Sequence, residues 1–197
     1  MKDFIIANET TIYNNGKKRA DILLINSPKI IYRVAYVQKD EQKATWQQVC
    51  DSFPIGDLLN ENTHSFDSKI YANDNTKIHL IAAVPKQIIE QTLLKFKSWI
   101  KIMEPIECRL IDLYKNEENT WLVFQQGENL RVIVIIDQLP SMVRLISIKT
   151  MDIQLSQMDI PKKIHFINIP YIDNSNISLL NEFCNKNNII RSNICTQ

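Results

Sequence analysis

The sequence predicts an α/β protein in which one arrangement of strands and helices occurs twice. Two observations support this prediction. Apolar residues alternate in short runs typical of strands and recur at three- and four-residue steps typical of helices. The order three strands, helix, strand, helix is found in residues 2–102 and again in residues 119–188. We therefore expect two lobes, residues 1–104 and 105–197, each with a mixed sheet flanked by helices.

The first lobe should begin with short strands. Asn15-Gly16 is a strong hairpin signal because both residue types tolerate positive φ. Pro28 should interrupt the pairing between two later strands. The strands are expected at residues 4–7, 10–13, 21–26 and 30–37. A helix capped by Asp40 follows at 41–53, and residues 54–76 are polar and predicted to be a loop.

The next segment has the clearest pattern of the first lobe. Residues 78–84 are almost continuously apolar, as in a buried central strand. Pro85 is suited to the first turn of a helix, and the apolar stripe of that helix includes Leu93 and Phe96 and extends to Met103. Residues 107–114 are predicted to be a strand that links the lobes.

The second lobe repeats this order with a turn at residues 126–129 and another at Leu139-Pro140. Strands are expected at 120–125, 130–136, 142–148 and 163–169, helices at 151–158 and 174–186, and a short strand after 189. Three strands, a helix, a strand and a helix form the core of an RNase H-like unit. Two such units side by side make the actin-like fold, which is the fold that we predict.

Composition excludes several classes of function. The net charge is +1 and neither half carries a basic block, so no nucleic-acid partner is expected. The longest apolar run, Val132–Ile136, is far shorter than the roughly 18 residues of a membrane span. None of the four cysteines is two residues from another, so zinc spacing is absent and reduced thiols are expected. They are Cys50, Cys108, Cys184 and Cys195.

An ATP site in an actin-like protein needs two tight turns in which glycine lets backbone N–H groups approach the phosphates. The corresponding turns are residues 7–10, without glycine, and 125–128. Glu9 and Glu128 would lie where phosphate binds. The sequence therefore favours a protein without a nucleotide, and an ATP-binding protein with degenerate motifs remains the alternative.

An RNase H-like nuclease needs three or four carboxylates around two metal ions. The candidates are Asp21, Asp112 and Asp137, but the first strand of each lobe carries no inward acid. Solvated positions are therefore expected for these acids. The histidines, His64, His79 and His165, show no catalytic spacing, although the last two occur near the starts of matching strands. We predict no catalytic, cofactor-binding or metal-binding residue.

Residues 77–148 contain "IHLIAAVPKQIIEQTLLKFKSWI", "IECRLIDLYK", "NTWLVFQQGENLRVIVI" and "LPSMVRLI". This stretch resembles the cytoplasmic actin-like domains of type IV pilus and type II secretion inner-membrane proteins. It is more similar to the members that lack nucleotide motifs, the secretion L protein and the bundle-forming-pilus C protein, than to the ATP-binding pilus M protein. Those two continue into a transmembrane helix, which this sequence does not contain.

The resemblance implies a non-catalytic cytoplasmic scaffold at the inner-membrane assembly platform. Its expected partners are the hexameric assembly ATPase and the polytopic platform protein, with self-association also possible and no cofactor. Docking is expected at an exposed edge strand or a groove between the lobes. The alternatives are an ATP-binding actin-like protein of the same machinery and an RNase H-like nuclease.

Overall fold

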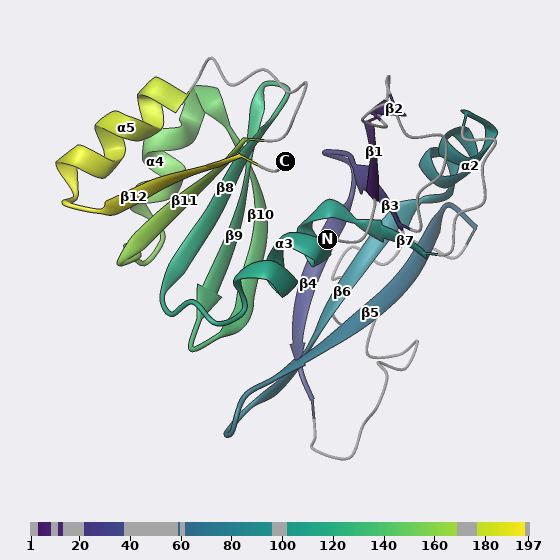
Figure 1. The fold of residues 1–197 in the computed structure, drawn as a ribbon, viewed down its shortest axis with the longest axis horizontal. Helices are drawn as coiled ribbons and strands as arrows, with labels where there is room; N and C mark the ends of the chain where they lie inside the picture. Colours follow the sequence, from purple (N-terminus) through teal and green to yellow (C-terminus); the bar gives the residue numbers. More distant parts are fainter. Residues whose placement is uncertain are drawn as a thin grey trace. The chain divides into compact units, whose positions relative to one another are not determined.

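The computed structural model describes residues 4–8, 12–13, 22–37, 59, 62–95, 102–168 and 177–195 (Figure 1). The chain forms two compact units, Met1–Leu113 and Tyr114–Gln197. The boundary thus falls after the segment 106–113, which the sequence analysis assigned to the second lobe. No helix in the described part of the chain has the length and hydrophobicity that a membrane crossing requires.

The first unit contains a four-stranded sheet with the order β2-β1-β3-β7. Its strands are β1 (Phe4–Asn8), β2 (Ile12–Tyr13), β3 (Ile22–Asn26) and β7 (Ile102–Pro105). β1 pairs with β2 antiparallel, and β3 is parallel to both β1 and β7. All five side chains of β3 are buried, which fits its apolar sequence and its central place.

A three-stranded antiparallel sheet with the order β4-β6-β5 completes the strands described in the first unit. Its strands are β4 (Ile31–Tyr36), β5 (His64–Ala72) and β6 (Lys77–Pro85). β6 is the central strand that the apolar run predicted. Ile81 and Ala83 of β6 form the buried centre of one face, packed against residues that include Ile31, Leu59 and Phe66.

Two helices are described in this part of the chain, α2 (Lys86–Lys95) and α3 (Ile106–Tyr114). Pro85 was expected in the first turn of this helix, but it is the last residue of β6, and α2 begins at Lys86. Its buried residues are Ile88 and Thr92, one turn apart, whereas Leu93 is 48% exposed. The predicted stripe through Leu93 is therefore wrong, because the buried face of α2 is turned by about one residue.

The second unit is built on a five-stranded sheet with the order β10-β9-β8-β11-β12. β8, β9 and β10 form an antiparallel meander, and β11 and β12 run parallel to β8. Along the chain, three strands, a helix, a strand and a helix follow one another, which is the predicted RNase H-like order. The elements are β8 (Thr120–Gln126), β9 (Asn129–Ile136), β10 (Leu139–Ser147), η1 (Ile148–Thr150), α4 (Met151–Ser156), β11 (Lys163–Asn168), α5 (Ile177–Lys186) and β12 (Ile190–Cys195).

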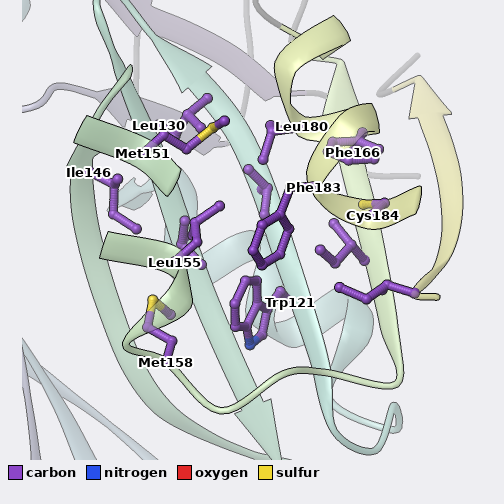
Figure 2. Packing of buried hydrophobic residues seen from close by; sticks show 14 of the residues in the cluster. Trp121, Leu130, Ile146, Met151, Leu155, Met158, Phe166, Leu180, Phe183 and Cys184 are labelled. Atoms are coloured by element: carbon purple, nitrogen blue, oxygen red, sulfur yellow. The ribbon is translucent and has the colours of Figure 1, made fainter. Parts of the chain in front are cut away.

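The core of the second unit lies between one face of this sheet and the helices α4 and α5 (Figure 2). Trp121 from β8 stacks on Phe183 from α5, with ring centroids 6.1 Å apart and planes 14° from parallel. Leu155 and Met151 from α4, and Leu180 and Cys184 from α5, surround the pair. Cys184 and Cys108 are buried free thiols, as expected.

Four sequence predictions are corrected by the structure. Residues 107–114 form the helix α3 and not a strand, because they bury neighbours on one helical face, including Leu110 and Ile111. The predicted loop at 54–76 contains β5, and the helix predicted to reach Met103 has ended before β7 begins.

The second turn of the meander was predicted at Leu139-Pro140. It is formed by Asp137-Gln138, both with positive φ, and Leu139 already begins β10.

Other predictions fall outside the described residues. They are the Asn15-Gly16 hairpin, the helix at 41–53 and the part of the apolar stripe that contains Phe96.

Candidate functional site

A cavity of about 430 Å³ lies within the first unit, between its two sheets. Residues 65–69 of β5 and all four residues of β7 line it. Successive side chains of a strand point to opposite faces, so a cavity lined by consecutive residues runs along the edge of the strand. β5 and β7 are also the outer strands of their sheets in the described part of the chain. The cavity is thus bordered by two strand edges.

The floor of the cavity is apolar. Leu80, Ala82 and Val84 occupy alternate positions of β6 and therefore share one face of the three-stranded sheet. Other apolar lining residues come from β3, α2, β7 and α3; they are Ile25, Ile89, Met103 and Cys108. The volume and this lining are those of a site for a small ligand or a short peptide segment.

Charged side chains lie at one side of the cavity. The Lys69 ammonium forms a close ion pair with Asp112 of α3, and its Nζ lies 3.8 Å from Oε2 of Glu104 in β7. Burial raises the pKa of Glu104, an effect that Lys69 opposes and Asp112 reinforces. This site therefore combines an apolar floor with a carboxylate whose nearest described cation is shared with a second acid.

Helix α3 is held against the same sheet face by buried polar contacts. The Tyr32 hydroxyl donates to Oε2 of Glu107 over 2.6 Å, and Glu107 is fully buried. The Tyr71 hydroxyl donates to the carbonyl oxygen of Cys108 over 3.4 Å. Burial also raises the pKa of the Cys108 thiol well above its usual range, so this thiol stays protonated and unreactive. These contacts fix α3 across both outer strands, β4 and β5.

The acids considered for a nuclease do not form a metal site in the described residues. Asp112 lies in a helix and pairs with Lys69, and Asp137 lies in an exposed turn with φ of 50°. Asp21 is outside the described residues. Among those that are described, no group of three or more His, Cys, Asp or Glu is placed to hold a metal ion.

His79 and His165 were expected near the starts of matching strands, but β6 is an antiparallel strand of the three-stranded sheet and β11 is a parallel strand of the five-stranded sheet. Each imidazole nonetheless lies beside a serine hydroxyl. Nδ1 of His79 lies 3.2 Å from the hydroxyl of Ser68 on the neighbouring strand, and Nδ1 of His165 contacts the hydroxyl of Ser192 on β12. Nε2 of His165 also lies 3.5 Å from Oε1 of Glu117. Serine, histidine and glutamate are the residue types of a catalytic triad. His165 is only 3% exposed, however, so a substrate has no access to it and a structural role fits better.

The pKa of His165 is consistent with that role. Burial lowers the pKa, the nearby Lys163 lowers it further, and Glu117 only partly opposes them. The imidazole is therefore neutral at pH 7. His64, in contrast, lies at the partly exposed start of β5, 2.9 Å from the Thr63 hydroxyl.

The second of the two turns that would bind phosphate is described. Gly127 has φ of 61°, and a Cβ added to it would meet nothing within 4 Å, so glycine serves the turn conformation here. Glu128 is exposed and lies 3.9 Å from Lys149. A cavity lined by the carboxyl ends of β8 and β11 has a volume of about 10 Å³, room for about one water. Glu9, in the first turn, lies outside the described residues.

No protein-family model matches the sequence, and no curated protein is similar to it. Solved structures are similar to the structure. A Bacteroides thetaiotaomicron VPI-5482 protein with an actin-like ATPase fold and unknown function matches with a TM-score of 0.55 and 10% identity, over 88% of this chain and 67% of that one. The PilM–PilN type IV pilus biogenesis complex matches with a TM-score of 0.56 and 9% identity, over 89% and 70% of the chains.

The fold is actin-like. The cytoplasmic domain of EpsL, an inner-membrane component of the Vibrio cholerae type II secretion system, matches at a TM-score of 0.45 and 9% identity, over 84% and 74% of the chains. The predicted fold class is confirmed by the Bacteroides thetaiotaomicron protein and the PilM–PilN complex, although their sequence identity to this chain is only 10% and 9%.

None of the residues that line the cavity was predicted to be a site residue. Lys69 lies in the segment 54–76, which was predicted to be a loop. Glu104 comes directly after Met103, where the predicted helix was expected to end. A signal for β5 was present, because Phe66, Ile70 and the residues between them alternate in the manner of a half-exposed strand. The position of β5 beside the cavity depends on how this strand pairs with β6, and no local sequence pattern indicates it.

Proposed function

We propose that the chain is a non-catalytic scaffold of a type IV pilus or type II secretion assembly platform, and that it binds an extended partner segment in the cavity between β5 and β7. The cavity along two strand edges is the observation that carries this proposal. The similarity of the fold to the PilM–PilN complex supports the choice of machinery. The scaffold would act on the cytoplasmic side of the inner membrane.

Strand addition is the proposed mode of binding. An extended segment beside β5 pairs its backbone with the strand edge, and every second side chain faces Leu80, Ala82 and Val84. Main-chain hydrogen bonds then provide affinity and the apolar floor provides selectivity. The proposed partners are an inner-membrane platform protein and the hexameric assembly ATPase.

Site-directed photocrosslinking tests this proposal in cells that carry the natural machinery. A benzophenone amino acid in place of Ser65, which is exposed on β5 and lines the cavity, is expected to crosslink to a platform protein or the ATPase. The matched control has the same amino acid in place of Lys149, which is exposed in the second unit. This control is expected to form no crosslink to either partner. Crosslinks only to a second copy of the chain, or to no pilus or secretion component, would contradict the proposal.

The proposal also holds that the chain neither binds nor hydrolyses ATP. Millimolar ATP with Mg²⁺ is therefore expected to leave the melting temperature unchanged, since a ligand that binds only the native state raises it by mass action. A thermal-shift scan checks this, with ADP as a second nucleotide. A concentration-dependent rise in Tm would favour the ATP-binding alternative instead.

A further inference from the structure

The charges around the cavity are unbalanced. The charged side chains that line it are Asp67, Lys69 and Glu104, two acids and one base. Lys69 is held closely by Asp112, so it reaches Glu104 only at 3.8 Å. Glu104 belongs to an outer strand, and its side chain is 17% exposed. The positive charge of Arg109 also favours the charged form of Glu104, but among the described residues no cation forms a closer ion pair with it than Lys69. A closer cation would stabilise a carboxylate this far removed from water.

A segment that enters the cavity changes the surroundings of Glu104. It displaces water and lowers the effective dielectric constant, which strengthens the interaction of Glu104 with any charge on the segment. A neutral segment would leave the carboxylate more poorly solvated, and an acidic one would be repelled. A lysine or arginine would supply a closer charge-assisted hydrogen bond than the described residues do. The raised pKa of Glu104 points the same way, because burial already disfavours its charged form.

We infer that the segment bound between β5 and β7 carries one cationic side chain, lysine or arginine, which pairs with Glu104, and apolar side chains at alternate positions beside it. This inference rests on the proposed docking of a partner segment in the cavity. It adds the chemistry by which that segment is selected.

A selection followed by a binding measurement tests the inference on the full chain. Random ten-residue peptides displayed on phage are selected against the protein. The peptides recovered are expected to share alternating apolar residues and one Lys or Arg. The strongest is synthesised with its cation and with Gln in that place, and both affinities are measured by fluorescence anisotropy. The cationic peptide should bind about tenfold more tightly or better, as expected for a hydrogen bond to a charged group.

Two variants assign this preference to one residue. Glu104→Gln should reduce the ratio between the two peptides to about threefold or less. Glu128→Gln removes the same charge from an exposed position in the second unit and should leave the ratio unchanged. Circular dichroism melting checks that both variants fold. If Glu104→Gln does not fold, the ratio of the two peptide affinities on the unmodified protein still tests the inference.

The outcomes separate the two proposals. If selected peptides bind with no preference for a cation, the inference is overturned while the docking site stands. If the preference persists in folded Glu104→Gln, the cation pairs elsewhere and the inference is likewise overturned. If no peptide is recovered, both this inference and the proposed docking site are overturned.

Discussion

Replacing Trp121 with alanine is expected to lower the free energy of unfolding by about 3–5 kcal/mol, the usual cost of removing a large buried aromatic side chain. Trp121 is almost completely buried at the centre of the second unit's core and stacks on Phe183 (Figure 2). Its removal leaves a cavity between the sheet and α5 that the regular packing of β8 cannot close.

Urea denaturation followed by circular dichroism measures this effect. Ile153→Ala, on the exposed side of α4, is the control and should change the free energy of unfolding by less than about 0.5 kcal/mol. A double-mutant cycle with Phe183→Ala should show a coupling of about 0.5–1.5 kcal/mol from the stacked rings. A loss below 1 kcal/mol for Trp121→Ala would mean that the core of this unit is assigned to the wrong residues.

Replacing Ile81 with aspartate is expected to destabilise the three-stranded sheet by about 4 kcal/mol or more, because it places an unpaired carboxylate in an apolar core. Ile81 is completely buried in the central strand β6. Because β6 holds β5 in place, the same change should abolish the proposed crosslinking from position 65.

Hydrogen–deuterium exchange followed by mass spectrometry locates the damage. Peptides from β5 and β6 should lose protection, whereas peptides from β8 and β9 should keep theirs, since the described core residues of the second unit all lie between Trp121 and Ile189. The matched control is Tyr36→Asp, an 81% exposed position in the same sheet, which should exchange like the unmodified protein. Equal protection of β6 in both variants would contradict the assignment of Ile81 to the core.

The second unit was predictable from sequence because its local patterns and its tertiary packing agree. The strands around Trp121 and Val132 are apolar runs bounded by turn residues, and each was expected within one residue of its observed bounds. The meander joins neighbours in sequence, so its pairing follows from turn chemistry alone. One shift was at Asp137-Gln138, where residues other than glycine adopt positive φ.

The first unit was less predictable because two of its segments carry ambiguous patterns. In α3, Ile106, Cys108 and Leu110 alternate as in a strand, yet Glu107 and Ile111 are buried as well, which only a helical face explains. The burial of Glu107 depends on the Tyr32 hydroxyl, a partner far away in sequence. β5 was hidden by the polar residues that an outer strand tolerates.

The candidate site could not be predicted, since its residues meet only through sheet pairing. Lys69 and Glu104 lie on strands of different sheets and are brought together by the fold. A glycine-rich phosphate loop, in contrast, is recognised from the residues themselves, and the sequence shows no such run of glycines.

The pairing of β7 with β3 also orders events during synthesis. Ile22 of β3 pairs with Ile102 of β7. This pair can form only after the three-stranded sheet and α2, which lie between them in the chain, have been synthesised. Closing so long a loop carries a larger entropy cost than the two-residue turns of the meander in the second unit. One wall of the cavity is β7, which leaves the ribosome after the rest of both sheets described in this unit. A nascent chain therefore has no complete cavity to offer a partner until residue 105 has joined the sheet.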